Sequence, residues 1–328
     1  MGTEYIFKSC FASLITNYFS YRNENYLSCN DYTLALRDFD KFCIDNHIDT
    51  NTLAKEIVMG WMNYHATKGD SLYWRSICIR QFAKYLNSIG ENAFVLPKSL
   101  YTPNITKPPY IATDEELRHF FSAADTIQTD RRRPFDCYVA PVVFRLQYTC
   151  GLRPNEVRLL KTSHVNLYNG EILIEKTKCH KQRIVVMSEQ MLNLCVKYDA
   201  IRKKISTNDT WMFPSDETAE NPYNGKQLNR LFEKCWRNAN PNIEHNELPR
   251  FCPYDLRHRY ASTILLKWIN EGKELNAMLP FLQTYMGHER ISHTAYYIHL
   301  LPEKLLHSDK LNLEQFASIM PEVTVWKE

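Results

Sequence analysis

Residues 148–160 have the sequence YTCGLRPNEVRLL, which combines a turn signal with the start of a helix. Gly151 can adopt a turn conformation that other residues avoid, and Pro154 suits the first position of a new helix. Arg153 is therefore predicted to lie where the chain enters a helix, with its guanidinium beside unpaired backbone N–H groups. Such a position suits a phosphate group. The alternative interpretation is a surface arginine that pairs with Glu156.

A predicted β-hairpin follows this segment. Two short runs rich in β-branched residues, Glu171–Ile174 and Arg183–Met187, flank the polar and basic loop 175–182. This pattern is typical of two antiparallel strands joined by a loop. The lysines of the loop are Lys176, Lys178 and Lys181. A lysine at a loop tip is normally a solvated charge, but Lys178 could also fold over the site that contains Arg153.

Two later segments combine basic residues with tyrosines. Residues 253–262 have the sequence PYDLRHRYAS, and residues 285–299 have the sequence YMGHERISHTAYYIH. In the second segment, His288 precedes Tyr297 by nine residues. Each segment carries little information by itself. Their order along the chain, with an arginine, a lysine, a second arginine, a histidine and a tyrosine, is far more specific.

In that order the segments resemble those of the tyrosine recombinases, also called phage-type integrases. Members of that family carry a GLRxxE segment with a first catalytic arginine, which Arg153 matches. A lysine on a β-hairpin follows in a KxxKxR pattern, which Lys178, Lys181 and Arg183 match. The resemblance covers nearly the whole chain and is strongest from 145 to 300.

The later part of the resemblance concerns the second arginine and the tyrosine. The family's HxLRH segment is matched around Arg257, except that Tyr254 takes the place of the usual histidine. The family's LGH segment, followed nine residues later by the nucleophilic tyrosine, is matched at His288 and Tyr297. Because Tyr296 directly precedes Tyr297, the assignment of the nucleophile depends on this register.

The resemblance implies an enzyme that breaks and rejoins DNA strands through a 3′-phosphotyrosine at Tyr297. Arg153 and Arg257 would hold the non-bridging phosphate oxygens, and His288 would add a hydrogen bond. Lys178 would give a proton to the departing 5′ oxygen. The chemistry implied here needs no metal ion, no ATP and no other cofactor.

The tyrosine at position 254 leaves the degree of activity open. A phenol can donate a hydrogen bond but is a poor proton shuttle near neutral pH. Either Tyr254 is tolerated, or catalysis is reduced. The alternatives to an active recombinase that moves or inverts a mobile DNA element are therefore two. One is a DNA-binding relative with reduced catalysis, and the other is strand relaxation of the type IB topoisomerase kind.

The predicted fold is mainly α-helical with a small β-hairpin. Residues 1–105 are predicted to be helical, because helical periodicity occurs there without period-two alternation. The resemblance implies that these helices form a core-binding domain that clamps DNA. The predicted helices of this domain are 31–43, 56–65 and 72–88. A proline-rich linker is expected at 94–110. Residues 106–328 are predicted to form an α+β catalytic domain, whose first helix has a capping-box pattern from Thr113 to Glu116.

DNA contacts are expected from both domains. The candidate DNA-binding residues are Arg75, Arg80, Lys84, Lys181 and Arg183. Arg80 and Lys84 are four residues apart on the predicted helix 72–88, on a face roughly opposite its apolar stripe. As solvated surface charges, Arg80 and Lys84 need no function at all, which is the alternative interpretation.

Exchange between two duplexes implies double-stranded DNA with inverted-repeat core sites and a homotetramer assembled on two of those sites. After Tyr297, four apolar residues fall at roughly helical spacing and need an apolar partner. These residues are Leu311, Leu313, Phe316 and Ile319. They could pack on their own domain or dock on a neighbouring copy, and the sequence leaves both arrangements open.

Composition excludes some classes of protein without selecting one. The net charge is only +3, from 40 basic and 37 acidic residues, so charge alone does not identify DNA as a partner. The ten cysteines include no CxxC pair, which argues against a zinc ribbon and favours reduced thiols. No stretch resembles a signal peptide or a membrane helix. The sequence therefore predicts a soluble, cytoplasmic protein.

Overall fold

The structure is a computed structural model, and the part of the chain that it describes comprises residues 5–25, 27, 29–68, 72–101, 108–128, 133–175, 182–216, 218 and 220–301. The chain forms two compact units, residues 1–107 and 108–328. The predicted domain boundary at residue 105 lies within 102–107, outside the described residues.

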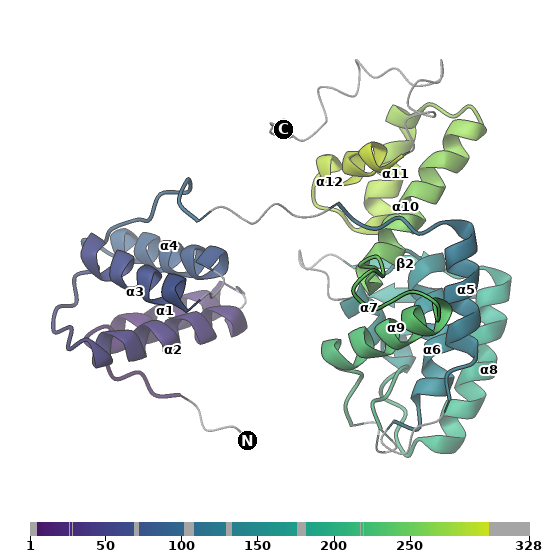
Figure 1. Ribbon diagram of the computed structural model, residues 1–328, viewed down its shortest axis with the longest axis horizontal. Coiled ribbons are helices and arrows are strands. Elements are labelled where there is room, and N and C mark those ends of the chain that lie inside the picture. The colour runs from purple at the N-terminus through teal and green to yellow at the C-terminus, as the bar shows by residue number, and fades with distance from the viewer. Residues whose placement is uncertain are drawn as a thin grey trace. The chain divides into compact units, whose positions relative to one another are not determined.

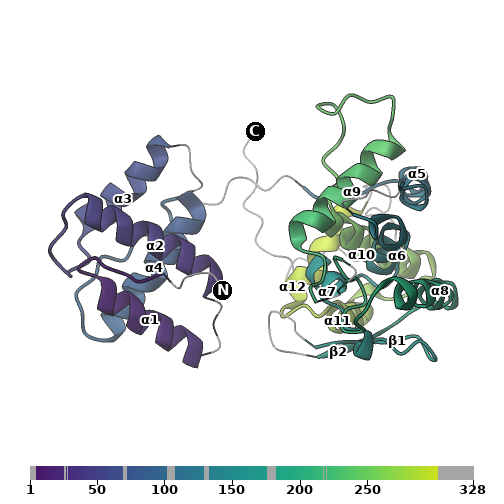
Figure 2. The same ribbon diagram turned by 90° about the horizontal axis from the view of Figure 1, so that it is seen from below.

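The first unit is helical throughout its described secondary structure (Figures 1 and 2). Its helices are α1 (Ala12–Glu24), α2 (Asn30–Asp45), α3 (Lys55–Thr67) and α4 (Leu72–Ser88). An aromatic cluster fills the core, where the ring of Phe39 lies 5.4 Å from the rings of both Phe11 and Trp61. Burial of such large side chains supplies most of the stabilisation of a small helical unit. The three predicted helices correspond to α2, α3 and α4.

The second unit contains the remaining helices and the hairpin. Its α-helices are α5 (Asp114–Asp125), α6 (Asp136–Thr149), α7 (Pro154–Arg158), α8 (Glu189–Ile205), α9 (Gly225–Ala239), α10 (Pro253–Asn270), α11 (Leu275–Met286) and α12 (Ile291–Ala295). Its 3₁₀ helices are η1 (Thr162–His164) and η2 (Tyr296–Leu300). The predicted capping box at the start of α5 is present, since the Thr113 hydroxyl accepts from the Glu116 backbone N–H.

The two strands of the hairpin are β1 (Glu171–Ile174) and β2 (Arg183–Val186), which pair antiparallel. Val185 faces the core, whereas Ile184 and Val186 are exposed, so β2 has the alternating burial of a strand with one solvated face. The predicted hairpin and the predicted fold class, mainly α with a small β-sheet, are confirmed.

Helix α10 connects two hydrophobic clusters of the second unit. Leu256, near its start, packs in the main core with α5, α6, α8 and α9. Further along, Ala261 and Leu265 pack with α11 and η2 in a second cluster. Arg257 therefore lies where the two clusters meet. Figure 1 shows α11 and α12 together at one end of this unit.

The turn between α6 and α7 packs closely on α10. Gly151 has φ +60, and a Cβ atom at this position would lie 2.5 Å from the ring of Tyr260. Any other residue at 151 would therefore need both a strained backbone and a shift of Tyr260. This contact fixes the entry to α7 against the helix that carries Arg257.

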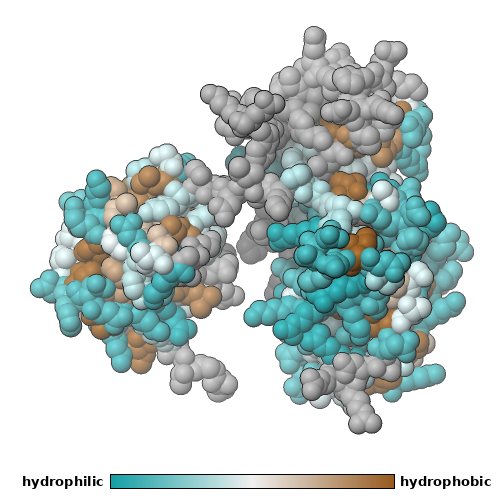
Figure 3. Space-filling view, in the orientation of Figure 1, coloured by the Kyte–Doolittle hydropathy of each residue, from teal (hydrophilic) through white to brown (hydrophobic). Residues whose placement is uncertain are grey.

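The visible surfaces of both units are mostly hydrophilic, with separate apolar patches between the hydrophilic residues (Figure 3). No helix in the described part of the chain is long and apolar enough to cross a membrane.

Candidate active site

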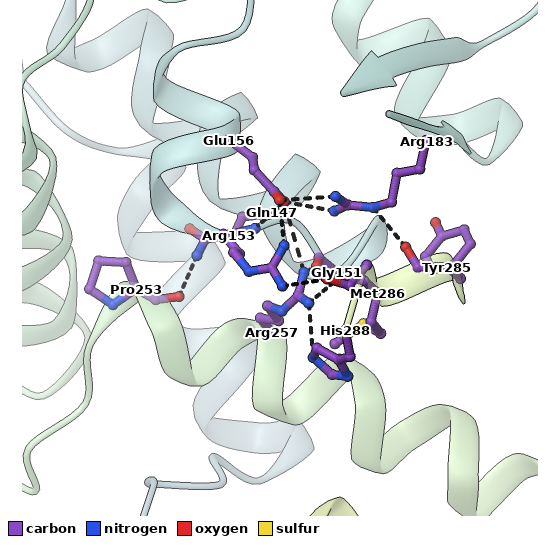
Figure 4. Close-up of polar contacts among 11 residues, drawn as sticks. Gln147, Gly151, Arg153, Glu156, Arg183, Pro253, Arg257, Tyr285, Met286 and His288 are labelled. Atoms are coloured by element: carbon purple, nitrogen blue, oxygen red, sulfur yellow. Dashed lines mark hydrogen bonds and ion pairs between the residues drawn. The ribbon is translucent and has the colours of Figure 1, made fainter. Parts of the chain in front are cut away.

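The carboxylate of Glu156 is the centre of a buried polar cluster (Figure 4). One of its oxygens accepts hydrogen bonds from the side chains of Arg153 at 2.7 Å and Arg183 at 2.9 Å. The other accepts from the Arg183 guanidinium at 2.7 Å and lies 3.8 Å from that of Arg257. Three arginines from three separate elements thus surround a carboxylate that is only 5% exposed.

Local structure explains why Arg153 and Glu156 lie together. Arg153 has an extended backbone at the N-cap of α7, and Pro154 occupies the first turn, as predicted. Glu156 is three residues on and accepts the Arg153 backbone N–H at 2.9 Å, which satisfies a free donor of the helix start. The Arg153 guanidinium also donates to the carbonyl of Gly287 at 2.8 Å. Glu156 therefore holds Arg153 at its backbone and at its guanidinium, and the Gly287 carbonyl holds the guanidinium from a second side.

Arg257 is fully buried and holds distant segments together. Its guanidinium donates to the carbonyl of Gly151 at 2.6 Å and to the carbonyl of Met286. Its Nε has no hydrogen-bond partner among the described residues. Burial, and then the positive charge of Arg153, lower the pKa of Arg257. This is the expected response of a buried cation whose charge is not fully balanced.

The cluster has an excess of positive charge. Burial alone would raise the pKa of Glu156, but hydrogen bonds from Arg183 and its charge hold that pKa at about 2. The carboxylate is therefore ionised at neutral pH, and it balances one of the three guanidinium charges. Buried charges are costly unless they are paired, so the remaining two charges make this a site for an anion.

Gly287 and Thr294 fix the position of His288. Gly287 ends α11 in a left-handed conformation with φ 64, and His288 follows directly. Nε2 of His288 lies 3.1 Å from Arg257, and its Nδ1 lies 2.8 Å from the Thr294 hydroxyl. Burial, and then the charge of Arg257, lower the pKa of His288 to about 3. The imidazole is therefore neutral at physiological pH.

Tyr297 lies against this histidine. It is the second residue of η2, and its ring stacks on that of His288 with centroids 5.8 Å apart. Its side chain is buried, and burial raises its pKa to about 12, although interactions with Arg257 act in the opposite direction. The phenol is thus held near the cationic cluster in its neutral form.

These groups open onto one pocket of about 1150 Å³. Those of its lining residues that can bind a substrate or transfer a proton include Arg153, Lys161, Tyr254, His258, His288 and Tyr297. Arg257 lies next to this pocket, 3.8 Å from Glu156 and 3.1 Å from His288. The arrangement offers to one substrate an anion site, the buried phenol of Tyr297 and imidazoles that include those of His258 and His288.

The phage integrase family matches residues 112–304, which is more than half of the chain. The chain belongs to the phage integrase family. It is a tyrosine recombinase, and the family and the enzyme class predicted from the motifs are confirmed.

Relatives in sequence extend over most of this recombinase. It is 28% identical over 260 residues to a protein of Sinorhizobium fredii named as an integrase/recombinase, with 76% of this chain and 77% of that protein covered. It is 27% identical over 253 residues to the tyrosine recombinase XerD of Rhizobium meliloti, with 73% and 72% covered.

Two solved structures share the fold of the recombinase. The Tn1549 transposon integrase in complex with transposon right-end DNA has a TM-score of 0.65 and 15% identity, with 94% of this chain and 99% of that chain covered. The site-specific recombinase XerH bound to palindromic difH substrate has a TM-score of 0.60 and 20% identity, with 84% and 77% covered.

The structure brings five of the six predicted catalytic residues of the recombinase into one site. These are Arg153, Tyr254, Arg257, His288 and Tyr297. The sixth, Lys178, and the predicted DNA-binding residue Lys181 lie outside the described residues.

Arg183 differs from its predicted role as a DNA contact. Its guanidinium donates to both oxygens of Glu156 and to the carbonyl of Tyr285, and the side chain is 8% exposed. These partners use all three nitrogens. Arg183 therefore fixes β2 and α11 to the cluster, and its guanidinium is buried against protein partners.

Arg80 in the first unit is also buried, so its predicted surface position is wrong. Its guanidinium donates to the carbonyls of Leu96 at 2.8 Å and Pro97 at 3.1 Å, and so ties α4 to the segment that follows it. Arg75 is partly buried against Asp38, while Lys84 is exposed as predicted.

Three features of the site were not predicted. Glu156 was expected to pair with one arginine at most, and it holds three. Thr294 orients His288 through a hydrogen bond. His258 lies in the pocket, with its ring 5.4 Å from that of Tyr297. The sequence shows that His258 directly follows Arg257, but it does not show that this helical position places His258 beside Tyr297.

Proposed function

We propose that this recombinase cleaves and rejoins DNA strands at specific sites through a 3′-phosphotyrosyl intermediate at Tyr297. The observation that carries this proposal is the contact between a buried phenol and an anion site. Tyr297 interacts with Arg257, and Arg257 belongs to a cluster in which three guanidinium groups face one carboxylate. A phosphodiester supplies the missing negative charge and the electrophile together.

In the proposed first step, the phenol oxygen of Tyr297 forms a bond to phosphorus and the bond from phosphorus to the 5′ oxygen breaks. Negative charge grows on the non-bridging oxygens during this displacement. Arg153 and Arg257 donate to those oxygens from positions fixed before the substrate arrives. His288, 3.1 Å from Arg257, orients that guanidinium at the same site. Fixed donors of this kind lower the barrier because they need no reorganisation.

In the proposed second half of the step, the departing 5′ oxygen takes a proton. Lys178 is our candidate donor, on the strength of the KxxKxR pattern. The covalent phosphotyrosine keeps an activated phosphate, so a 5′-hydroxyl from another strand can attack it and release Tyr297. Tyr254 is 40% exposed at the pocket, where its phenol can donate to a bound phosphate.

The similar proteins support the proposed substrate and assembly. Relatives are named as integrase/recombinase and tyrosine recombinase, and the similar folds include a recombinase bound to a palindromic substrate and a transposon integrase bound to transposon-end DNA. We therefore propose double-stranded DNA with inverted-repeat core sites as the substrate, and a mobile element as its source. The same proposal includes a homotetramer on two sites and a cytoplasmic location.

Covalent capture tests the chemistry. Nicked duplexes that tile the DNA on both sides of the encoding gene are incubated with the protein, since a nick beside the cleaved phosphate traps the intermediate. We expect an SDS-resistant complex whose modified peptide contains Tyr297. Tyr297→Phe should abolish capture and leave DNA binding intact, and Tyr296→Phe is the matched control.

Three outcomes contradict the proposal. DNA attached to Tyr296 contradicts the assigned nucleophile. Binding without capture on every duplex favours a DNA-binding relative with reduced catalysis. Relaxation of supercoiled plasmid that lacks any captured site favours strand relaxation of the type IB topoisomerase kind.

Deletion of residues 308–328 tests the assembly. We expect the truncated protein to fold and to bind single sites, but to lose the complex that joins two duplexes, because the apolar residues from Leu311 to Ile319 would dock on a neighbouring copy. Gel shifts with one and two labelled duplexes measure both properties. Normal recombination by the truncated protein, or its failure to fold, rejects docking on a neighbour.

A further inference from the structure

The attacking tyrosine needs a base. Tyr297 is buried, and that burial raises its pKa to about 12. A phenolate is therefore scarce at neutral pH, and the proton must leave as the oxygen attacks phosphorus. Two imidazole rings lie within reach, those of His288 at 5.8 Å and His258 at 5.4 Å between ring centroids.

The hydrogen bonds of His288 occupy both of its nitrogens. A guanidinium only donates, so Nε2, 3.1 Å from Arg257, must accept. The ring proton then lies on Nδ1, which donates to the Thr294 hydroxyl at 2.8 Å. His288 has no lone pair left for the proton of Tyr297, and it is suited to hold Arg257 in place.

His258 has the opposite character. In the part of the chain that the structure describes, its Nδ1 is buried and has no hydrogen-bond partner. Its ring lies between two phenols, with centroids 5.0 Å from Tyr254 and 5.4 Å from Tyr297. An unpartnered buried nitrogen costs stability, so its persistence beside a nucleophile indicates a use for it.

We infer that His258 is the general base that accepts the phenolic proton of Tyr297 during cleavage. This inference rests on the proposed function. As the Tyr297 oxygen bonds to phosphorus, its proton passes to the imidazole of His258, and the 5′ oxygen leaves with a proton from the general acid. In rejoining, the protonated His258 returns its proton to the departing oxygen of Tyr297. Tyr254, which cannot perform this transfer readily, lies beside the group that does.

The charges around His258 make the basicity of its imidazole depend on whether substrate is bound. Burial, and then the charge of Arg257, lower its pKa to about 4, so the ring is neutral and a weak base in the free protein. The ionisable groups packed around it are Tyr254 and Arg257 on its own helix, and Tyr297 on η2. A phosphate bound to Arg257 offsets the positive charge that weakens the base. Proton transfer is therefore favoured when DNA occupies the site.

Single-turnover capture on the nicked duplex tests the inference with His258→Gln, which keeps a polar side chain but cannot accept the proton. We expect the rate of capture to fall by about 100-fold or more at neutral pH, the usual scale for a general base, with DNA binding unchanged. His245→Gln changes an exposed histidine outside the pocket and is the matched control. A rate for His258→Gln within a few-fold of the wild type overturns the inference.

A duplex with a 5′-bridging phosphorothioate distinguishes a base that acts on Tyr297 from an acid that acts on the leaving group. The reason is that the departing thiolate needs no proton. We expect His258→Gln to stay slow on this substrate. Recovery to the wild-type rate would show that His258 serves the leaving group, and would overturn the inference. Adding Tyr254→His to His258→Gln should restore at least part of the lost rate, which loss of packing alone would not allow.

If His258→Gln fails to fold, the wild-type protein still decides the matter. On the phosphorothioate duplex its rate should fall as the pH drops from about 6.5 towards 4, since His258 becomes protonated between its ordinary pKa and its value in the free protein. A rate that stays flat through that range overturns the inference. Absence of any capture by the wild-type protein instead contradicts the proposed function.

Discussion

Two clusters around buried arginines in the second unit differ in charge: one is balanced, and the other has an excess of positive charge. At the end of α8, Arg202 is 1% exposed and donates to Asp199 and Asp209, while Lys203 pairs with Asp199 at 2.8 Å. Two cations therefore meet two carboxylates. At the start of α7, three arginines meet Glu156. The protein itself balances the charges of the first cluster, whereas the second cluster keeps an excess of positive charge.

The two clusters show how charge balance separates a structural site from a binding site. Burial lowers the pKa of Arg202, but its two carboxylates reverse the effect and raise it. The pKa of Arg257 stays lowered, because burial and the charge of Arg153 outweigh Glu156. Both guanidinium groups are equally inaccessible, so burial alone does not distinguish their roles. The unbalanced positive charge around Arg257 distinguishes its role from that of Arg202.

Removal of the single carboxylate of the second cluster should have the largest effect, a loss of stability of the second unit. Glu156→Gln leaves three buried guanidinium groups without an anion and should destabilise the second unit by about 3–5 kcal/mol. Urea unfolding, followed by a probe in that unit, measures the loss. Asp199→Asn removes the buried one of the two carboxylates beside Arg202 and is the matched control. An equal loss in both variants would mean that the charge imbalance has no energetic consequence.

The same carboxylate should make stability depend on pH. The pKa of Glu156 is about 2 in the folded protein against 4.5 for the free group, a difference worth about 3 kcal/mol. Because the folded value is the lower one, this stability is present above pH ~4.5 and is lost as the pH falls towards 2. The difference in unfolding free energy between wild type and Glu156→Gln should therefore shrink over that range. A constant difference would contradict the assignment.

The arginines should differ in their effect on chemistry. Arg153→Ala or Arg257→Ala should lower the rate of covalent capture by at least ~100-fold, the scale for the loss of a transition-state donor. Arg202→Lys should leave the rate per folded molecule unchanged, since its cluster lies outside the pocket. Single-turnover capture with equal amounts of folded protein measures all three. Near wild-type rates for both alanine variants would place the active site elsewhere.

Tyr254→His should have the smallest effect. It introduces the residue that the related enzymes usually carry, so activity should be preserved or raised, by at most ~10-fold, which is below the full effect of a general base. The same capture assay measures it. A large loss of rate would mean that the phenol has a role in the anion site that its exposed position does not indicate.

Local signals in the sequence were sufficient for much of the fold. The predicted helix 72–88 coincides with α4, and the capping box at Thr113 marks the start of α5, because both depend on neighbours within a few residues. Leu34 of α2 is 67% exposed, whereas Leu36 and Phe39 of the same helix are fully buried. Helical spacing defines a face only approximately, and tertiary packing selects its final width.

The site was predictable where motifs mark it and unpredictable where partners are distant. The order of the motifs selected Arg153 and Tyr297. The partners of Arg80 and Arg183 are carbonyls and a carboxylate that only folding brings near, so both appeared as free surface cations. The roles of Lys178 and of the DNA-binding residues stay predictions.

The hydrogen bonds of Arg257 bear on the synthesis of the protein. Its guanidinium needs the carbonyls of Gly151 and Met286, which lie far apart on either side of it in the sequence. A nascent chain that has not yet released Met286 leaves this buried cation short of an acceptor, so the anion site forms late. Tyr297 follows only eleven residues after that carbonyl. The carbonyl that completes the anion site and the proposed nucleophile therefore become available to the folding chain almost together.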